Sequence, residues 1–317
     1  MKIKYKFFNA LFLIIVSAFV FASCRQTSNI EVKNGISVTD ADGKTVIIAD
    51  SSRIVTVGTA LTETVEALGA GNKLVGVDNS SAEYVPETAS LPKVGPRTTL
   101  NAEGILSLKP TLVIVNADSG PPEVLEQLRK SGVSVLTLTP NYTVETVKSK
   151  VETIARALNL TAKGKEINDS IDKEISEVAE LLKKKQSTPK VMFVGRGPNM
   201  PNATMSGAGT TIDEMINLAG GTNPFTDFTG FREMTNEAVV AVQPDAILIT
   251  QHSFERSGGA DGVVTFPGVA LTPAGRNKRI IPVSDMYFQG FGPGVGRAVR
   301  ELVYKFHPEL DPNAAQK

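Results

Sequence analysis

The apolar positions of this chain follow two periods in turn. Between residues 36 and 140, short runs rich in Val, Ile and Leu alternate with segments in which apolar residues recur every three or four positions. These are the patterns of buried strands and of helices. The predicted strands are 53–57, 74–77, 112–115 and 133–138, the predicted helices are 61–68 and 122–130, and an opening β-hairpin is predicted for 36–39 and 45–48. The alternation predicts a parallel sheet covered by helices.

A long helical stretch follows this region. From Val144 to about Lys185, apolar residues recur at spacings of three and four, and a break is expected near residues 161–164. At ~1.5 Å per residue, such a helix is long enough to run along one lobe and reach another. Because a helical connector is stiff, we expect lobes joined in this way to close by small angles.

A phrase that occurs twice predicts two similar lobes. It spans residues 100–115 and again 234–249. In each copy a polar residue opens a short helix, a Glu lies in its first turn, a Pro closes it, and a β-branched run follows as a buried strand. The second region also has predicted strands at 191–194 and 279–283 and helices at 212–218 and 295–306. We expect an α/β fold of two lobes with mostly parallel sheets, joined by a long rigid helix, with a ligand cleft between them.

The first residues predict export from the cytoplasm. Lys2, Lys4 and Lys6 form a positive segment, residues 7–21 are almost wholly apolar, and small residues precede Cys24, as in a lipobox. Cys24 is the only cysteine, so it can form no intramolecular disulfide. We favour lipidation of Cys24 over an uncleaved anchor, for which the run is short against the ~20 residues of a membrane span. The expected parts are a signal peptide 1–24, a tether 25–35, an N-terminal lobe 36–140, a connecting helix 141–186 and a C-terminal lobe 187–317.

Charge and motifs argue against two functional classes. Lys+Arg and Asp+Glu number 33 each, so the chain has no excess of positive charge to attract nucleic acid. Patterns typical of enzymes, such as a Gly-x-Ser-x-Gly elbow or a Walker A sequence, do not occur. Asp213 and Glu214 are neighbours at a predicted helix start, where carboxylates complement the helix dipole, so we interpret them as capping residues.

The loops expected at the carboxyl ends of the strands carry the candidate chemistry. They are rich in Gly, Ser, Asn and Pro, with scattered Tyr, Met, Phe, Arg and His, which suits a wide pocket for a flat, largely apolar ligand. His252 follows a predicted strand and either faces the cleft or lies in a surface loop, whereas His307 is expected to be a solvated terminal residue. Tyr84, in a polar loop, is a recognition residue, a phenolate ligand for iron, or a loop residue packed against Pro86.

Several stretches resemble bacterial haem-binding substrate-binding proteins of ABC importers. These stretches are residues 58–64, 68–70, 92–104, 118–123, 271–277 and 290–293. The family belongs to the helix-backbone class, which also includes cobalamin and ferric-siderophore binders. The resemblance implies a lipid-anchored, extracytoplasmic protein that captures haem as its transported ligand and delivers it to an ABC importer permease. The alternatives are a cobalamin or ferric-siderophore binder on the same scaffold and, from a different class, a tetrapyrrole-processing enzyme.

The resemblance also implies ligands for the haem iron. In the family a tyrosine in the loop after the second strand of the first lobe coordinates iron, and Tyr84 occupies the matching loop. Some relatives add a second axial ligand from the other lobe. Here the candidates are Met200, Met205 and His252, of which His252 is either a variant ligand or a neighbour of a haem propionate.

Four further residues match functional positions of the family. Arg97 and Arg232 are candidates to hold propionates or to donate a hydrogen bond to the phenolate, a role that suits the planar guanidinium group. Glu103 and Glu237 match acidic residues that dock into basic pockets of the permease, and each also stabilises its own helix N-terminus. The expected partners are haem, the permease and, through the lipid, the membrane, and the protein is expected to be a monomer.

Overall fold

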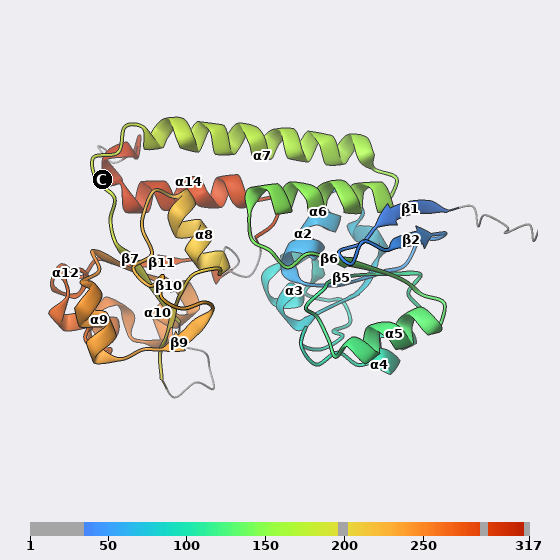
Figure 1. Ribbon diagram of the computed structural model, residues 1–317, viewed down its shortest axis with the longest axis horizontal. Coiled ribbons are helices and arrows are strands. Elements are labelled where there is room, and N and C mark those ends of the chain that lie inside the picture. Colours follow the sequence, from blue (N-terminus) through green and yellow to red (C-terminus); the bar gives the residue numbers. More distant parts are fainter. Residues whose placement is uncertain (1–34, 196–201, 286–290, 314–317) are drawn as a thin grey trace, which may run out of the picture. The chain divides into compact units, whose positions relative to one another are not determined.

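The computed structural model describes residues 35–195, 202–285 and 291–313, and Gly35–Lys317 forms a unit of its own. Its two main sheets lie in the two halves of this unit (Figure 1). We call the half that ends with β6 (Ser134–Leu138) the N-lobe, and the half that begins with β7 (Val191–Gly195) the C-lobe. Among the described residues, no helix combines the length and the apolar character that a membrane crossing requires.

The N-lobe sheet is parallel throughout, in the strand order β4–β3–β5–β6. Its other strands are β3 (Ile54–Val57), β4 (Leu74–Val77) and β5 (Leu112–Asn116), and the helices are α2 (Thr59–Ala67), α3 (Asn79–Tyr84), α4 (Ala102–Ser107), α5 (Pro122–Lys130) and α6 (Val144–Ala157). Leu112 and Ile114 pack in the same cluster as residues of α2 and α6, whereas Val113 and Val115 pack with α4 and α5. Strand side chains alternate between the two faces, so helices cover both and β3 is fully buried.

The predicted hairpin is confirmed. β1 (Ile36–Thr39) and β2 (Thr45–Ile48) pair antiparallel, with Gly43 at φ 74° in the turn. A side chain would be strained at this positive φ, which explains why glycine follows Asp42. Short 3₁₀ helices complete the connections at Gly71–Lys73, Pro86–Thr88, Val269–Leu271 and Pro308–Leu310.

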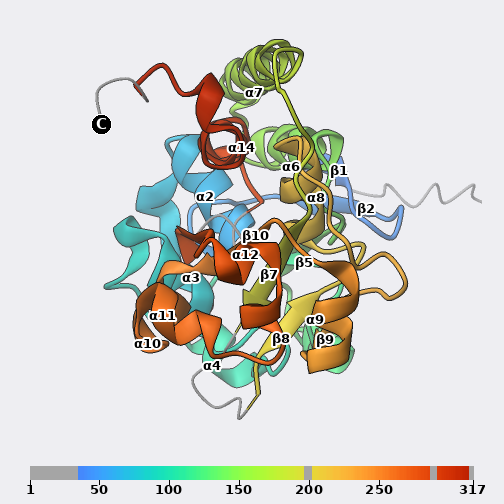
Figure 2. The ribbon, with the colours of Figure 1, turned by 90° about the vertical axis from the view of Figure 1, so that its left-hand side faces the viewer.

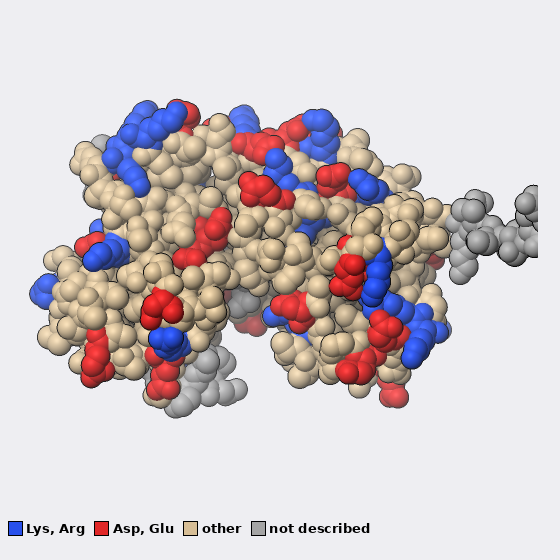
Figure 3. All heavy atoms as spheres, viewed as in Figure 1, with Lys and Arg blue, Asp and Glu red and all other residues tan. Residues whose placement is uncertain are grey.

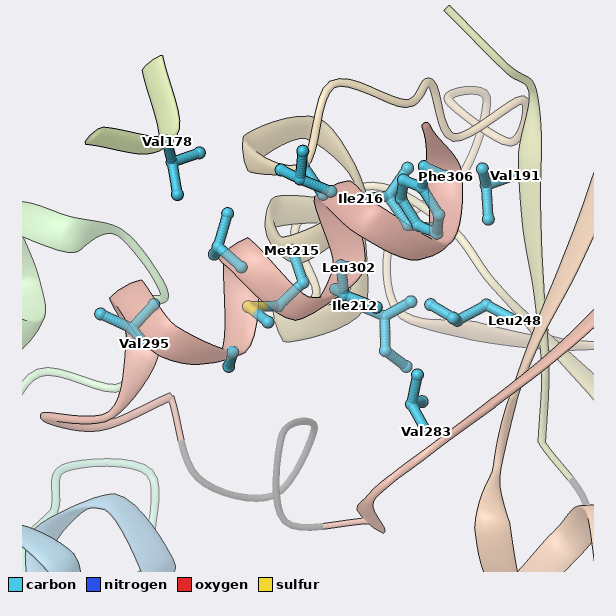
Figure 4. Packing of buried hydrophobic residues seen from close by; sticks show 14 of the residues in the cluster. Val178, Val191, Ile212, Met215, Ile216, Leu248, Val283, Val295, Leu302 and Phe306 are labelled. Carbon is cyan, nitrogen blue, oxygen red and sulfur yellow. The ribbon is translucent and has the colours of Figure 1, made fainter. Parts of the chain in front are cut away.

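The C-lobe sheet is mixed, in the order β11–β10–β7–β8–β9. Its strands are β7, β8 (Thr204–Ser206), β9 (Phe231–Glu233), β10 (Ala246–Thr250) and β11 (Ile280–Val283), and its helices are α8 (Thr211–Leu218), α9 (Asn236–Val242), α10 (Gln251–Arg256), α11 (Gly259–Val264), α12 (Pro273–Arg276) and α14 (Val295–Phe306). The first three strands are parallel, whereas β8 and β9 pair antiparallel. Figure 4 shows Leu302 and Phe306 of α14 beside Ile212 and Ile216 of α8 in the core. The prediction of mostly parallel sheets is therefore confirmed.

The middle of the chain forms two helices rather than one connector. α6 ends at Ala157, and α7 (Thr161–Leu182) begins after a turn in which Asn159 has φ 59°. The predicted break near residues 161–164 is therefore a few residues too late. Lys148 of α6 pairs with Asp172 of α7 at 2.5 Å. α6 covers the N-lobe sheet, while α7 alone runs along both α6 and α14 (Figures 1 and 2).

Two contacts hold α7 in place, one a close approach at a glycine and the other an ion pair. A Cβ at Gly164 would lie 2.4 Å from the Cβ of Ala155, so only glycine lets α7 approach α6 this closely. At its other end, Glu177 pairs with Arg300 of α14 at 2.5 Å. One 22-residue helix, about 33 Å long, thus packs against a helix of each lobe.

A buried carboxylate joins the lobes a second time. Glu63 of α2 accepts a hydrogen bond from the N–H of Gly294 at 3.0 Å, and Gly294 is the N-cap residue of α14. Helix α14 has no capping hydrogen bond from the side chain of its own N-cap position, which is a glycine. Glu63 therefore caps this helix from the other lobe. Its second oxygen, Oε2, is buried without a hydrogen-bond partner among the described residues. Burial raises the pKa of Glu63 to about 7, against the opposing effects of the Gly294 N–H and Arg297.

The expectation for His307 is wrong. This residue follows α14, but its side chain is fully buried, so close to Gly220 that a Cβ there would lie 3.1 Å from Nε2. Burial is the main effect on its pKa, which is lowered. His307 was expected to be exposed to solvent because it precedes Pro308 near the end of the chain. The last turn of α14 instead packs into the core through Phe306.

Candidate functional site

Residues of both lobes line a narrow crevice of about 120 Å³. It lies where β3, β4 and β5 end, the edge at which parallel α/β sheets bind ligands. Its lining residues are Gly58, Thr59, Ala60, Asp78, Ser80, Arg97, Asn116, Tyr142, Lys150, Thr211 and Phe291. A neighbouring hollow of about 460 Å³ shares Tyr142 and is bounded by Asp118, Asp213 and Glu214.

A buried hydroxyl network fixes the loops beside the crevice. Asp78, 1% exposed, accepts hydrogen bonds from the N–H of Gly58 at 2.9 Å and from the hydroxyl of Ser81. The Ser81 hydroxyl in turn contacts Thr62 at 2.8 Å. Side chains from α2, α3 and the end of β4 are therefore locked together, and this positions α3, which ends in Tyr84.

The structure places Tyr84 in a helix and not in a loop. It is the last residue of α3 and is half-buried. The hollow that it lines, about 430 Å³, also includes Gln251, Pro282, Val283, Ser284, Asp285, Glu301 and Lys305. Burial, and after it the charges of Glu83 and Asp285, raises the pKa of Tyr84 to about 12. The phenol is therefore neutral at physiological pH until a cation binds its oxygen.

The three candidate second ligands differ in access. His252 lies in the first turn of α10, is exposed, and donates its backbone N–H to Asp285 at 3.3 Å. Asp285 thus lies near both Tyr84 and the start of α10. Met205 is 1% exposed in strand β8 within a hydrophobic cluster, so the described structure does not present it to solvent. Met200 and Cys24 lie outside the described residues.

The two candidate arginines lie in different surroundings. Arg97 lines the crevice and pairs with Asp118 at 2.6 Å. Arg232 is exposed on β9, with its guanidinium 4.1 Å above the Phe228 ring and 3.6 Å from Asp227. Among the described residues, neither arginine lines the 430 Å³ hollow of Tyr84. Phe231 beside Arg232 is 59% exposed, an apolar residue of the C-lobe surface that the sequence did not single out.

The repeated phrase has the same local structure in both lobes. Asn101 caps α4 by accepting from Gly104, and Thr235 caps α9 by accepting from Ala238. The residues before the two prolines, Lys109 and Gln243, are both left-handed, with φ of 51° and 46°. Glu103 and Glu237 are both exposed in the first turns of these helices, α4 and α9. This position fits helix capping and leaves each carboxylate open to solvent.

Sequence reasoning missed Lys150. This residue is 5% exposed and its side chain lines the crevice, where burial lowers its pKa to about 8 against the opposing charge of Asp118. A signal was present, because Lys150 follows Val147 by three and precedes Ile154 by four positions, which places it on the apolar side of α6.

Comparison with known proteins decides the family. The family model described as periplasmic binding protein matches residues 54–285. The chain belongs to this family. The haem-binding protein RhuT from Roseiflexus sp. RS-1, in apo form, is 37% identical, with a TM-score of 0.76 over 83% of this chain and 100% of RhuT. The haem-binding protein BhuT, in complex with two haems, is 32% identical, with a TM-score of 0.77 over 83% of this chain and all of BhuT.

Curated relatives point to the same transport role with other ligands. The substrate-binding lipoprotein YvrC of a Bacillus subtilis ABC transporter is 28% identical over 86% of each chain. The vitamin B12-binding protein of Vibrio cholerae is 27% identical over 64% of this chain and 72% of its own length. The protein is therefore an extracytoplasmic substrate-binding protein of an ABC importer and not an enzyme, as expected.

The face of the molecule shown in Figure 3 mixes Lys and Arg with Asp and Glu, and no large area of it carries charge of one sign.

Proposed function

We propose that this periplasmic binding protein captures haem between its lobes, with Tyr84 as a ligand to the iron, and delivers it to its importer. The observation that carries this proposal is the position of Tyr84. A tyrosine of the N-lobe sits half-buried in a hollow whose other residues come from β11, α10 and α14 of the C-lobe. A haem bound at this tyrosine would contact both lobes, as binding between lobes requires.

The surroundings of Tyr84 suit ferric iron as the bound cation. Glu83 and Asp285 place negative charge near the phenol, which disfavours a free phenolate but favours a cation. Ferric iron is such a cation, and a phenolate is an established axial ligand of haem. His252 on α10 is the remaining described candidate for the opposite face of the haem, and Arg97 and Arg232 remain candidates for its propionates.

The soluble fragment that begins after Cys24 tests the proposal by titration with haemin. Wild-type protein should give a shifted Soret band and a charge-transfer band of phenolate-ligated ferric haem. Tyr84→Phe should lose that band and weaken haemin binding more than about tenfold, because the ring remains and only the ligating oxygen is removed. Tyr304→Phe, a half-buried tyrosine of α14 that packs against the C-lobe core, is the matched control and should bind haemin as the wild type does.

Other spectra would assign the site differently. An unchanged ferric spectrum in Tyr84→Phe would refute the tyrosine ligand, and a lost band in Tyr304→Phe would show that the band does not report on Tyr84. Replacing His252 by Ala then distinguishes six-coordinate from five-coordinate iron, since only a ligating imidazole changes the spectrum on removal.

We further propose that Cys24 carries the lipid anchor and that Glu103 and Glu237 contact the permease. Both glutamates are exposed at equivalent points of the repeat, one in each lobe.

The lipid anchor is tested separately. Labelling of cells with a fatty-acid probe should mark the wild-type protein and not Cys24→Ala.

The second candidate ligand is a corrinoid. The similarity to a vitamin B12-binding protein favours it. A competition titration distinguishes the two, because cyanocobalamin in excess displaces haemin only if the cleft accepts a corrinoid.

A further inference from the structure

Lys150 is the charged residue of the crevice whose position needs an explanation. Its side chain lies on the apolar side of α6, and the residue is 5% exposed. Burying an ammonium group without an opposite charge is costly, so buried lysines are normally paired. Among the described residues, no carboxylate lies within ion-pair distance of Lys150.

The carboxylates nearest to the crevice are already engaged. Asp118, whose charge acts on Lys150, pairs with Arg97 at 2.6 Å. Asp78 accepts the N–H of Gly58 and the hydroxyl of Ser81. The Lys150 ammonium therefore faces the crevice without a dedicated anion.

The size of the crevice limits what can enter it. About 120 Å³ corresponds to roughly four water molecules at ~30 Å³ each. This volume admits a short carboxylate arm but not a macrocycle. Thr211 and Phe291 close the crevice from the side of the C-lobe, so an arm inside it would be held by both lobes.

We propose that Lys150, with Arg97, forms a subsite for one carboxylate-bearing arm of the transported ligand. This inference rests on the proposed function, since haem carries two propionate arms of the required size. It adds the residue that would set specificity, because an ammonium group favours a carboxylate strongly over an uncharged ester or amide. The ligand class predicted for the subsite is an alkyl monocarboxylate attached to a larger ring.

The test pairs two ligands with three proteins. Haemin and haemin dimethyl ester, whose propionates are uncharged, are titrated against wild type, Lys150→Met and Lys148→Met. Met has nearly the same length as Lys without its charge. Lys148 is the control, because it lies on the same helix but pairs with Asp172 on the side of α7. Wild type and Lys148→Met should prefer haemin by about 10- to 100-fold, whereas Lys150→Met should lose most of this preference.

Two results would overturn the subsite. Lys150→Met could weaken both ligands to the same extent, which would indicate a structural role for Lys150, or it could leave the preference for haemin unchanged. Absence of any haemin binding by the wild type would instead refute the proposed function.

A second measurement tests the subsite without haem. Sodium propionate should raise the melting temperature of the wild type more than propionamide does at equal concentration and ionic strength. In Lys150→Met the two additives should act alike. Equal effects of propionate and propionamide on the wild type would refute the subsite, whatever the haem result.

Discussion

Replacing Glu63 by Gln should change how the stability of the fold depends on pH. The carboxylate of Glu63 lies between α2 and the start of α14, where it accepts the N–H of Gly294 at 3.0 Å. A Cβ at Gly292 would lie 2.3 Å from its Oε2, so the group is tightly enclosed. Gln has the same shape and can accept the same hydrogen bond, but it does not titrate. The variant therefore isolates the charge of this residue.

The magnitude follows from the pKa in the folded state, which is about 7 against an ordinary value of 4.5 for a glutamate. The folded protein holds the Glu63 proton more tightly than the unfolded chain does. Its free energy of unfolding must therefore fall as pH rises from the unfolded-state pKa to the folded-state pKa. At about 1.36 kcal/mol for each pKa unit, the loss across this window amounts to about 3 kcal/mol.

Urea denaturation of the soluble fragment between about pH 5 and about pH 8 measures this effect. The Gln variant should differ little from wild type at the acid end and be more stable by up to about 3 kcal/mol at the alkaline end. Glu180→Gln is the control, because Glu180 is exposed and its pair with Lys183 contributes little. If the curves of wild type and Glu63→Gln ran parallel over this range, the charge of Glu63 would not be buried in the folded state.

Three further predictions follow from other parts of the structure. Because the pKa of Tyr84 is about 12, its phenol must release a proton when it binds iron as a phenolate. The affinity for haemin should therefore rise by up to about tenfold per pH unit near neutrality in the wild type and not in Tyr84→Phe. Equal pH profiles of the two proteins would exclude a protonated resting tyrosine. The double change Glu103→Ala with Glu237→Ala should leave haemin spectra intact and abolish haem-stimulated ATP hydrolysis by the reconstituted importer, the loss of buried charged contacts costing about 2–5 kcal/mol; full stimulation would leave these residues a capping role alone. Gly164→Ala should lower the free energy of unfolding by about 1–3 kcal/mol, and adding Ala155→Gly should restore part of it, since the two Cβ atoms would otherwise overlap; no loss in the single variant would contradict the close approach of α7 to α6.

The fold was largely predictable because its elements carry strong local signals. The helix 122–130 begins with Pro122 and ends before Ser131 and Gly132, as predicted. The repeated phrase predicted two similar lobes, and the structure adds the matching left-handed residues before its prolines. These signals are local in sequence, so they can be recognised without knowing the tertiary contacts.

The site was less predictable, because burial depends on contacts between distant segments. Tyr84 was expected in a polar loop, yet residues 79–84 form a helix held by Asp78 and by a hydroxyl of α2. Met205 was a candidate ligand because the family resemblance implies a second ligand from its segment, and only the pairing of β8 between β7 and β9 shows it to be buried. Lys150 had a periodic signal, but the residues that line the crevice with it belong to other elements.

The way in which α6 and α7 pack has a consequence for unfolding. Val144 and Val147 of α6 belong to the hydrophobic cluster of the C-lobe, whereas Ile154 of the same helix belongs to that of the N-lobe. Ile167 of α7 packs against both clusters. Neither half can therefore lose its packing without exposing apolar surface of the other, so the chain should unfold in a single cooperative transition. A chain cut within α7 should accordingly yield two fragments that fold only when they are mixed.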